Sequence, residues 1–168
     1  SDIMTETDTV RYGHVKLPSL GWGEKDGTVT NSERRVSRQR AFLPAPGAAK
    51  ADSWQMAEVG KRMGWVDAFD YPDAATVFRE FAQLTAFENY DDRDLNLGAL
   101  SDVRSEVYET LPSFQWPQKS SFDPSKQTRF FANGQFYTPD RKARFMPTDA
   151  FKVDANANKL RLNTGRVR

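Results

Sequence analysis

The chain has 168 residues, of which 38% are hydrophobic, and its 24 basic and 23 acidic side chains give a formal net charge of +1. This length suits one domain or slightly more, and twelve phenylalanines and four tryptophans exclude a chain that stays disordered. The near-neutral charge gives no overall electrostatic attraction to nucleic acid or a membrane, and no apolar run is long enough to span a bilayer. The lack of cysteine excludes cysteine-bound zinc, iron–sulfur clusters and thiolate catalysis within this chain.

The first third of the chain is predicted to be mostly loop. A short strand is expected over residues 14–18, "HVKLP", where the proline ends it. Residues 21–47 combine glycines, Thr-Asn-Ser and four arginines, which favours a polar loop with an extended run over residues 27–44. The Pro-rich stretch before Gly47 then predicts a turn.

The first helix is predicted to begin at Asp52 and to end at Gly64. Asp52 is a natural N-cap, Gln55 completes a capping-box-like pair, and glycine is a common helix stop. The residues expected on the buried face, at helical spacing, are Met56, Val59, Gly60 and Met63.

Two further helices are predicted, one beginning near Asp73 and one running from Ser101 to about Leu111. The expected buried residues are Val77, Phe81 and Leu84, flanked by Phe78, in the earlier helix and Val103, Val107 and Leu111 in the later one.

The last third is rich in aromatic residues and turns. Two aromatic runs are joined at Asn133-Gly134, a dipeptide that strongly favours a β-hairpin. Residues 159–168, "KLRLNTGRVR", are predicted as a strand that enters a turn.

Two polar features could contact a ligand. The turn "GWGEKDG" could bring backbone amides and Lys25 close to an anion, or it could be a tight turn with a solvated lysine. Asp52 could serve only as a helix cap, or its carboxylate could accept two hydrogen bonds from the N1 and N2 edge of guanine. The local pattern favours the cap and leaves both alternatives open.

The run "ERRVSRQR" places several arginines together, and on an extended chain Arg34, Arg38 and Arg40 share one side. A clamp for anions or carboxylates, nucleic-acid binding, and a structural role are the three alternatives. The structural role is favoured because no aromatic residue is interleaved with this run and the chain is near neutral.

Independent catalysis is not expected. His14 is the only histidine, and a lone histidine without cysteine is a poor metal site, which favours a structural or surface role. No serine lies in a strained elbow motif, and the sequence gives no reason to pair two carboxylates as acid and base.

The stretch "GWGEKDGTVTNSERRVSRQRAFLPAPGAAKADSWQMAEVGKRMG", followed by "QWP", "RFFANGQFYTPDRKARF" and "TGRVR", resembles a segment of bacterial molybdopterin-dependent oxidoreductases. It is most similar to the catalytic subunit of assimilatory nitrate reductases, with formate dehydrogenases as near relatives. The resemblance covers essentially the whole chain and implies an internal piece of a larger enzyme, here called the parent enzyme.

The resemblance implies a mixed α/β fold, in which a helical segment follows an α/β dinucleotide-binding region and β-hairpin strands lead toward a β-rich C-terminal domain. Residues 1–112 would end the central α/β domain, residues 113–158 would form a linker with a hairpin, and residues 159–168 would begin the C-terminal dinucleotide-binding domain. The surplus of aromatic residues fits this interpretation, because the rest of the parent enzyme would cover them.

The implied parent enzyme reduces nitrate to nitrite with molybdenum on two molybdopterin guanine dinucleotides. Its [4Fe–4S] cluster is not bound by this chain, and its partners are an electron-donor protein or domain and the remainder of the polypeptide. A cytoplasmic location is expected, and neither nucleic acid nor membrane is an expected partner. Matching positions imply cofactor contacts from Ser1, Asp2, Lys25, Asp52, Thr164, Gly165, Arg166, Val167 and Arg168, and no catalytic residue or metal ligand in this chain.

One departure from the family concerns the predicted first strand. Where relatives carry Ala-Asp-Val before apolar residues and Leu-Pro, this chain reads "YGHVKLP", so that His14 replaces the acid and Lys16 interrupts the apolar run.

Two rival functions are a piece of a formate dehydrogenase or another molybdopterin oxidoreductase, and a non-catalytic interaction module that binds an acidic partner through residues Arg34 to Arg40.

Overall fold

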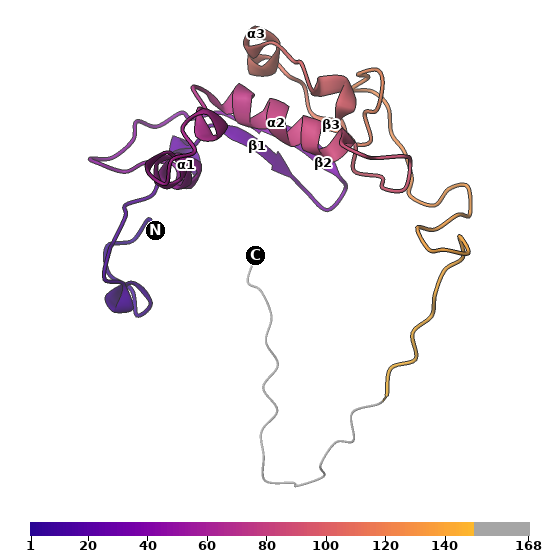
Figure 1. Cartoon of the computed structure of the whole chain (residues 1–168), viewed down its shortest axis with the longest axis horizontal. Helices are drawn as coiled ribbons and strands as arrows, with labels where there is room; N and C mark the ends of the chain where they lie inside the picture. The colour runs from indigo at the N-terminus through magenta and orange to yellow at the C-terminus, as the bar shows by residue number, and fades with distance from the viewer. Residues whose placement is uncertain (150–168) are drawn as a thin grey trace, which may run out of the picture. The chain divides into compact units, whose positions relative to one another are not determined.

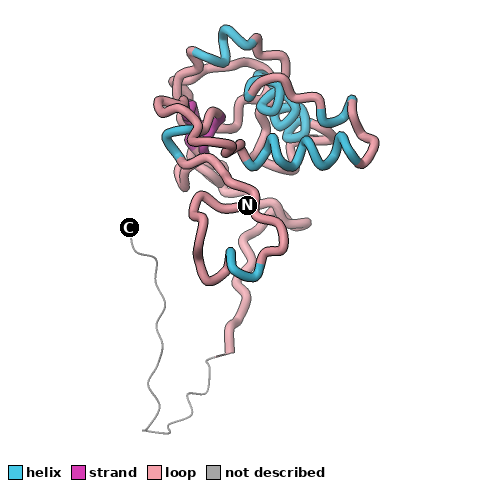
Figure 2. The backbone as a smooth tube through the Cα atoms, turned by 90° about the vertical axis from the view of Figure 1, so that its left-hand side faces the viewer, coloured by secondary structure: helices cyan, strands magenta, loops and turns pink. Residues whose placement is uncertain are grey.

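The computed structural model describes residues 1–149. The chain divides into two compact units, Ser1–Asn133 and Gly134–Arg168, and all the helices and strands of the described residues lie in the first unit. Much of that unit is loop (Figure 2). Within residues 1–149, no helix is long and apolar enough to cross a membrane.

A three-stranded antiparallel sheet forms the centre of the first unit. Strands β1 (Gly27–Thr30), β2 (Arg35–Gln39) and β3 (Phe114–Gln115) lie in the order β1-β2-β3. β1 pairs with β2 in a register that sets Thr30 opposite Val36. The polar segment predicted as a loop with an extended run is therefore a β-hairpin.

The turn of this hairpin is stabilised by Asn31. Its Oδ1 accepts hydrogen bonds from the backbone N–H groups of Glu33 (2.9 Å) and Arg35 (3.1 Å). Arg34 occupies the left-handed region with φ of 64° and donates its own N–H to the Asn31 carbonyl at 3.0 Å. Asparagine side chains commonly stabilise turns in this way, so the segment "TNSERR" contains the residue that stabilises the turn.

The described residues contain three α-helices, which lie between β2 and β3 in the chain: α1 (Asp52–Arg62), α2 (Ala74–Ala86) and α3 (Ser105–Glu109). The predicted start of α2 near Asp73 is confirmed, and Asp73 is its N-cap, because the Asp73 carboxylate accepts the Thr76 N–H at 2.7 Å. The third helix is shorter than predicted, because a tight turn at Gly98–Leu100 precedes it instead of continuous helix from residue 101. Further short 3-10 turns lie at Val10–Tyr12, Trp22–Glu24 and Asp67–Phe69.

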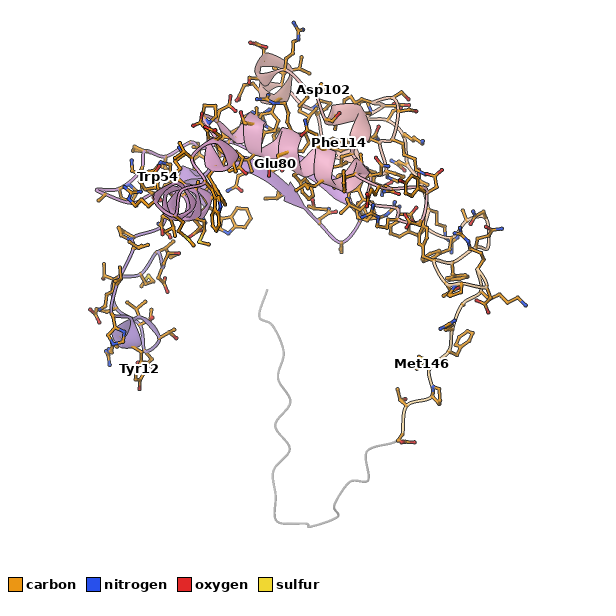
Figure 3. All side chains as sticks on the ribbon, in the orientation of Figure 1. Tyr12, Trp54, Glu80, Asp102, Phe114 and Met146 are labelled. Carbon is orange, nitrogen blue, oxygen red and sulfur yellow. The ribbon has the colours of Figure 1, made fainter. Side chains whose placement is uncertain are left out.

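The hydrophobic core lies where α2 covers the sheet (Figure 1). Phe114 of β3 is completely buried, whereas Trp54 on α1 remains 48% exposed (Figure 3). The buried residues of the core are Val36, Ala75, Phe78, Ala82, Leu97, Leu100, Tyr108, Leu111 and Phe114.

The predicted buried faces of α1 and α2 are wrong. In α2, Phe78 is buried with Ala75 and Ala82, while Val77, Phe81 and Leu84 are exposed. Both faces of α2 carry apolar residues, and the face with the small residues is the one that fits closely against the sheet. The sequence periodicity could not separate two apolar faces on one helix.

The prediction for α1 is wrong in the same way: Met56, Val59 and Met63, which were expected to be buried, are exposed. Of the predicted stripe only Gly60 is buried, and a Cβ added there would lie 2.5 Å from a Phe69 ring carbon. Glycine is therefore required at this position by the close approach of the Phe69 ring.

Two predicted β elements are absent from the described residues. Residues 14–18 are exposed and form no strand, only an isolated bridge between Pro18 and Asp2. Lys16 interrupts the apolar run there, and its Nζ pairs instead with Glu6 at 3.3 Å.

The hairpin predicted at Asn133-Gly134 has no strands either. In the first unit, the Phe130 ring lies 3.7 Å from the Arg34 guanidinium and 5.4 Å from the Trp116 ring, so the first aromatic run covers the β-hairpin turn. In the second unit, Arg141 donates its N–H to the Thr138 carbonyl in a local turn.

Candidate functional site

The Asp52 carboxylate collects donors from three distant parts of the chain. Its Oδ1 accepts the Ser1 and Ser19 hydroxyls, each at 2.7 Å, and its Oδ2 accepts the Lys25 ammonium at 3.1 Å. Three of the residues predicted to contact a cofactor, Ser1, Lys25 and Asp52, therefore meet at one carboxylate.

The backbone around Ser19 brings these parts together. Ser19 donates its N–H to the Asp2 carbonyl at 3.0 Å, and Lys50 donates its N–H to the Pro18 carbonyl at 3.1 Å. The segment through Ser19 is thus bridged on one side to Asp2 and on the other to Lys50. Ser1 and Asp52 lie next to these bridges, which explains why the Ser1 and Ser19 hydroxyls reach the same Asp52 oxygen.

Lys25 is placed by the turn "GWGEK". The Gly21 N–H donates to a Glu24 carboxylate oxygen at 2.7 Å, and the Gly23 carbonyl accepts two N–H groups from the segment 42–43 at 2.8 and 2.9 Å. A Cβ at Gly23 would lie 2.9 Å from Leu43, so the close approach needs glycine. The tight turn is confirmed, but Lys25 is paired with Asp52 and is only 35% exposed, so it is not a freely solvated lysine.

Asp52 does not cap its helix. The N-cap position is Ala51, no side chain there or at Asp52 caps the first turn, and Gln55 donates to the Pro18 and Lys50 carbonyls at 3.0 and 3.1 Å. The predicted cap and capping-box pair are both wrong. The Asp52 carboxylate is bonded by two hydroxyls and an ammonium, whereas a capping carboxylate would be bonded by N–H groups of the first helical turn.

These donors stabilise the ionised form of Asp52. Hydrogen bonds from Ser1 and Ser19, then the Lys25 hydrogen bond and charge, hold the pKa of the carboxyl well below its usual range. The Asp52 side chain is also 50% exposed. It is therefore an ionised, partly open acceptor at neutral pH, which suits the N–H edge of a ligand.

The other predicted contacts lie elsewhere. The Asp2 carboxylate accepts the Met4 N–H at 2.9 Å and is not a partner of Asp52. Thr164, Gly165, Arg166, Val167 and Arg168 lie outside the described residues. A cavity of about 430 Å³ is lined by Ser1, Asp2 and parts of residues 3–18, and neither Lys25 nor Asp52 lines it.

Two polar residues of the cluster were not predicted as part of a site: the sequence holds no signal for Ser19, and its pattern places Gln55 in a capping pair. Ser19 is 7% exposed and Gln55 is 8% exposed, so both are buried beside the half-open carboxylate. Their role depends on the backbone bridges that join Asp2 to Pro18 and Ser19 to Lys50, and no local sequence pattern predicts these bridges.

The arginines of "ERRVSRQR" are used inside the protein. Arg34 donates to the Trp116 carbonyl at 2.8 Å and to the Thr128 carbonyl, and Arg40 donates to the Glu109 carbonyl at 3.1 Å. These contacts favour the structural role over the anion clamp and the acidic-partner site.

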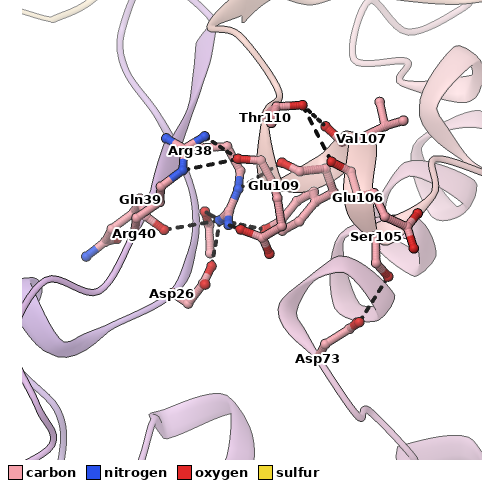
Figure 4. A network of polar contacts seen from close by, with 12 residues as sticks. Asp26, Arg38, Gln39, Arg40, Asp73, Ser105, Glu106, Val107, Glu109 and Thr110 are labelled. Carbon is pink, nitrogen blue, oxygen red and sulfur yellow. Dashed lines mark hydrogen bonds and ion pairs between the residues drawn. The ribbon is translucent and has the colours of Figure 1, made fainter.

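Arg38 has the strongest internal role (Figure 4). Its side chain is 1% exposed and donates to Asp26 (2.6 Å), Glu109 (3.1 Å) and the Tyr108 carbonyl (3.0 Å). Burial opposes its charge, but the hydrogen bond to Asp26 and the charges around it outweigh burial and raise the pKa of the guanidinium. Arg38 therefore ties β2 to α3 as a buried cation.

Within residues 1–149, no group of three or more histidine, cysteine, aspartate or glutamate side chains is arranged to hold a metal ion. His14 is exposed, as expected for a surface role.

Comparisons with known proteins relate the chain to one family. The family described as molybdopterin oxidoreductase matches residues 1–62, which include Ser1, Lys25 and Asp52. A nitrate reductase of Klebsiella oxytoca is 40% identical over all of this chain and 19% of its own length. The assimilatory nitrate reductase catalytic subunit of Bacillus subtilis is 30% identical over 96% of this chain and 22% of its own length. A putative formate dehydrogenase of Bacillus subtilis is 34% identical over 95% of this chain and 15% of its own length. The chain thus spans about a fifth of the length of such relatives.

Proposed function

We propose that this chain, which is homologous to one stretch of the molybdopterin oxidoreductases, helps to hold the guanine dinucleotide part of a molybdenum cofactor in a longer parent enzyme. The observation that carries the proposal is the convergence of Ser1, Ser19 and Lys25 on the Asp52 carboxylate. Three members of this cluster are positions that the family resemblance implies for cofactor contact.

The chemistry of the cluster fits a guanine nucleotide. An ionised carboxylate can accept the N1 and N2 hydrogens of guanine together, and such paired, charge-assisted bonds are both strong and selective. Asp52 has about four acceptor sites, of which three are used by the donors named above. A ligand therefore adds to one free site and displaces one exposed donor, for which the exposed Ser1 hydroxyl is suited.

Lys25 supplies the positive charge of the site. Its ammonium lies 3.1 Å from Asp52 and keeps two further protons for an anionic partner such as a phosphate of the dinucleotide. Thr164 to Arg168 are proposed to contact the second dinucleotide, as the resemblance implies. When bound, the cofactor supplies the redox chemistry of nitrate reduction, and this chain positions it.

We further propose that the parent enzyme reduces nitrate to nitrite in the cytoplasm, receives electrons from a donor protein or domain, and binds its [4Fe–4S] cluster outside this cysteine-free chain. Nitrate reductases are 40% and 30% identical to the chain, and a putative formate dehydrogenase is 34% identical. Formate oxidation is accordingly the second candidate activity.

The test uses the parent enzyme with Lys25→Ala or Asp52→Ala. Each variant loses a charged contact with the cofactor, so we expect a fall of at least about tenfold in bound molybdenum and guanine nucleotide per polypeptide. Metal analysis and nucleotide release measure the two contents. Nitrate-dependent oxidation of reduced viologen dye is expected to fall in proportion.

Lys61→Ala and Asp70→Ala are matched controls, because these residues form a similar lysine–aspartate pair at 3.4 Å between α1 and the end of the Asp67–Phe69 turn. Their cofactor content is expected to equal that of the wild type. Full cofactor content in both site variants would show that the site assignment is wrong. A molybdenum-loaded parent that ignores nitrate but oxidises formate would retain the site and replace the substrate.

The exposed apolar faces of α1 and α2 point to the remainder of the parent polypeptide as a partner. Met63 is 63% exposed and Leu84 is 61% exposed, and each lies beside other exposed apolar residues of its helix. Exposed apolar clusters of this kind mark interaction surfaces. About four-fifths of the length of the relatives lies beyond the part that this chain matches, so we propose that these faces pack within the same polypeptide.

This proposal predicts protection from labelling. Met63→Cys and Leu84→Cys in the native parent enzyme are expected to react with a maleimide at least about tenfold more slowly than in the unfolded parent, because a packed thiol reacts only when the structure opens. Peptide mass spectrometry measures each site. Ser120→Cys, at an exposed position, is the control and is expected to react quickly. Rapid labelling of both test sites would contradict packing of these faces.

A further inference from the structure

We propose that Ser19 and Gln55 are positioning residues that hold the Asp52 carboxylate in the orientation in which it accepts the ligand. This inference rests on the proposed function, because it concerns the same carboxylate. Neither residue belongs to the set of cofactor contacts that the family resemblance implies. The two residues are instead buried behind the carboxylate that would make the contact.

Ser19 differs from the other two donors in its burial. Ser19 is 7% exposed, whereas Ser1 is exposed and the Lys25 side chain is 35% exposed. A ligand that approaches from solvent can displace an exposed donor, but the Ser19 hydroxyl lies on the protein side of Asp52. The Ser19 bond at 2.7 Å is therefore the contact that remains to orient the carboxylate when a ligand binds.

Gln55 supports the direction of that bond. Its Nε2 lies 3.4 Å from the Ser19 hydroxyl oxygen, and it also donates to the Pro18 and Lys50 carbonyls. The amide nitrogen has two protons for three acceptors, so the longer Ser19 contact shares a proton with a carbonyl. An amide nitrogen donates only, so the serine oxygen accepts in this contact and its single proton is directed to Asp52. The result is an ordered chain from Gln55 to Ser19 to Asp52.

The backbone makes this chain rigid. Ser19 lies between the bridge to Asp2 and the bridge to Lys50, and Gln55 bonds the carbonyls on both sides of it. Groups whose own positions are fixed by neighbouring hydrogen bonds hold a binding group in its productive geometry. Ser19 and Gln55 therefore supply preorganisation, and Asp52 supplies the contact.

The test compares cofactor retention across a pH series in the parent holoenzyme with Ser19→Ala, Gln55→Met and the wild type. Ionised Asp52 is the form that accepts N–H donors, so retention is lost as the pH falls through the pKa of Asp52. Its pKa is depressed below the ordinary value of about 4, and the Ser19 bond is one cause. Removal of that bond raises the pKa, so the loss of cofactor moves to higher pH.

We expect Ser19→Ala to raise the cofactor dissociation constant about tenfold near neutral pH, as for loss of one hydrogen bond to a charged group, and to move the acid loss of guanine nucleotide to higher pH. Gln55→Met is expected to shift the profile in the same direction by less. Ser19→Thr keeps the hydroxyl and is expected to restore the wild-type profile. Ser53→Ala, at an exposed neighbour on α1, is the matched control.

The pH profile separates positioning from a general structural defect. Equal loss of cofactor at every pH in Ser19→Ala and Gln55→Met, or a profile that coincides with the wild type, would overturn the positioning role. If Ser19→Ala does not fold, Gln55→Met alone decides by the same criterion. Full retention in Asp52→Ala would instead refute the proposed function itself.

Discussion

Replacement of Arg38 by methionine is expected to destabilise the chain by about 3 kcal/mol. The Arg38 side chain is 1% exposed and bonds the half-exposed carboxylates of Asp26 and Glu109, and its removal breaks both ion pairs and leaves a gap where the guanidinium was buried. The Gly27 carbonyl, at 2.6 Å, and the Tyr108 carbonyl lose their donor at the same time. Urea unfolding of the 168-residue chain, followed by tryptophan fluorescence, measures the change.

Two further variants make this prediction specific. Arg38→Lys keeps the charge but has three donors on a flexible stem, so we expect it to restore only part of the loss. Arg62→Met is the control, because Arg62 is 73% exposed and pairs with Glu58 one helical turn away. Its expected cost is below about 0.5 kcal/mol. Equal midpoints for Arg38→Met and Arg62→Met would show that the buried network does not stabilise the fold.

Replacement of Phe114 by alanine is expected to cost about 3–5 kcal/mol, as is typical of a buried phenylalanine. Phe114 is 0% exposed, lies edge-on to Phe122 with ring centroids 5.3 Å apart, and pairs with Val36 across the sheet. The cavity left by its ring would lie where β3 and β2 meet the core helix. A fall in the urea midpoint with an unchanged slope would indicate lost stability without a change in the unfolded state.

The matched control for this prediction is Phe145→Ala, because Phe145 is 94% exposed. Its expected cost in the isolated chain is below about 0.5 kcal/mol. Phe114→Leu is expected to cost less than Phe114→Ala, since it leaves a smaller cavity. A loss at Phe145 as large as that at Phe114 would contradict the observed placement of the core.

Two aspartates show which side-chain contacts a local sequence pattern can predict and which it cannot. Both Asp73 and Asp52 stand at the start of a predicted helix, and the sequence predicts an N-cap role for Asp52. Asp73 caps α2 through Thr76, three residues away. Asp52 bonds Ser1, Ser19 and Lys25 instead, which are 51, 33 and 27 residues away. A local cap can be predicted from spacing, whereas a carboxylate that meets distant donors cannot.

The buried face of α2 likewise could not be predicted from local spacing. The sequence places Phe78 and Phe81 three residues apart on α2, yet only Phe78 is buried in the described structure. Periodicity identifies the apolar faces but not which of them meets the sheet. The face left exposed here is the one we propose to pack within the parent polypeptide.

By itself, the sequence determined the existence of α1 and α2, the start of α2 near Asp73, the tight turn before Lys25, and the family resemblance with its candidate contacts at Ser1, Lys25 and Asp52. These features depend on residues close together in the chain or on positions matched to relatives. Only the tertiary structure decided the β1–β2 hairpin, the buried Arg38, and the roles of Ser19 and Gln55. The physical reason is that hydrogen bonds and burial between distant segments depend on how the backbone brings them together, and side chains then take the strongest partners within reach.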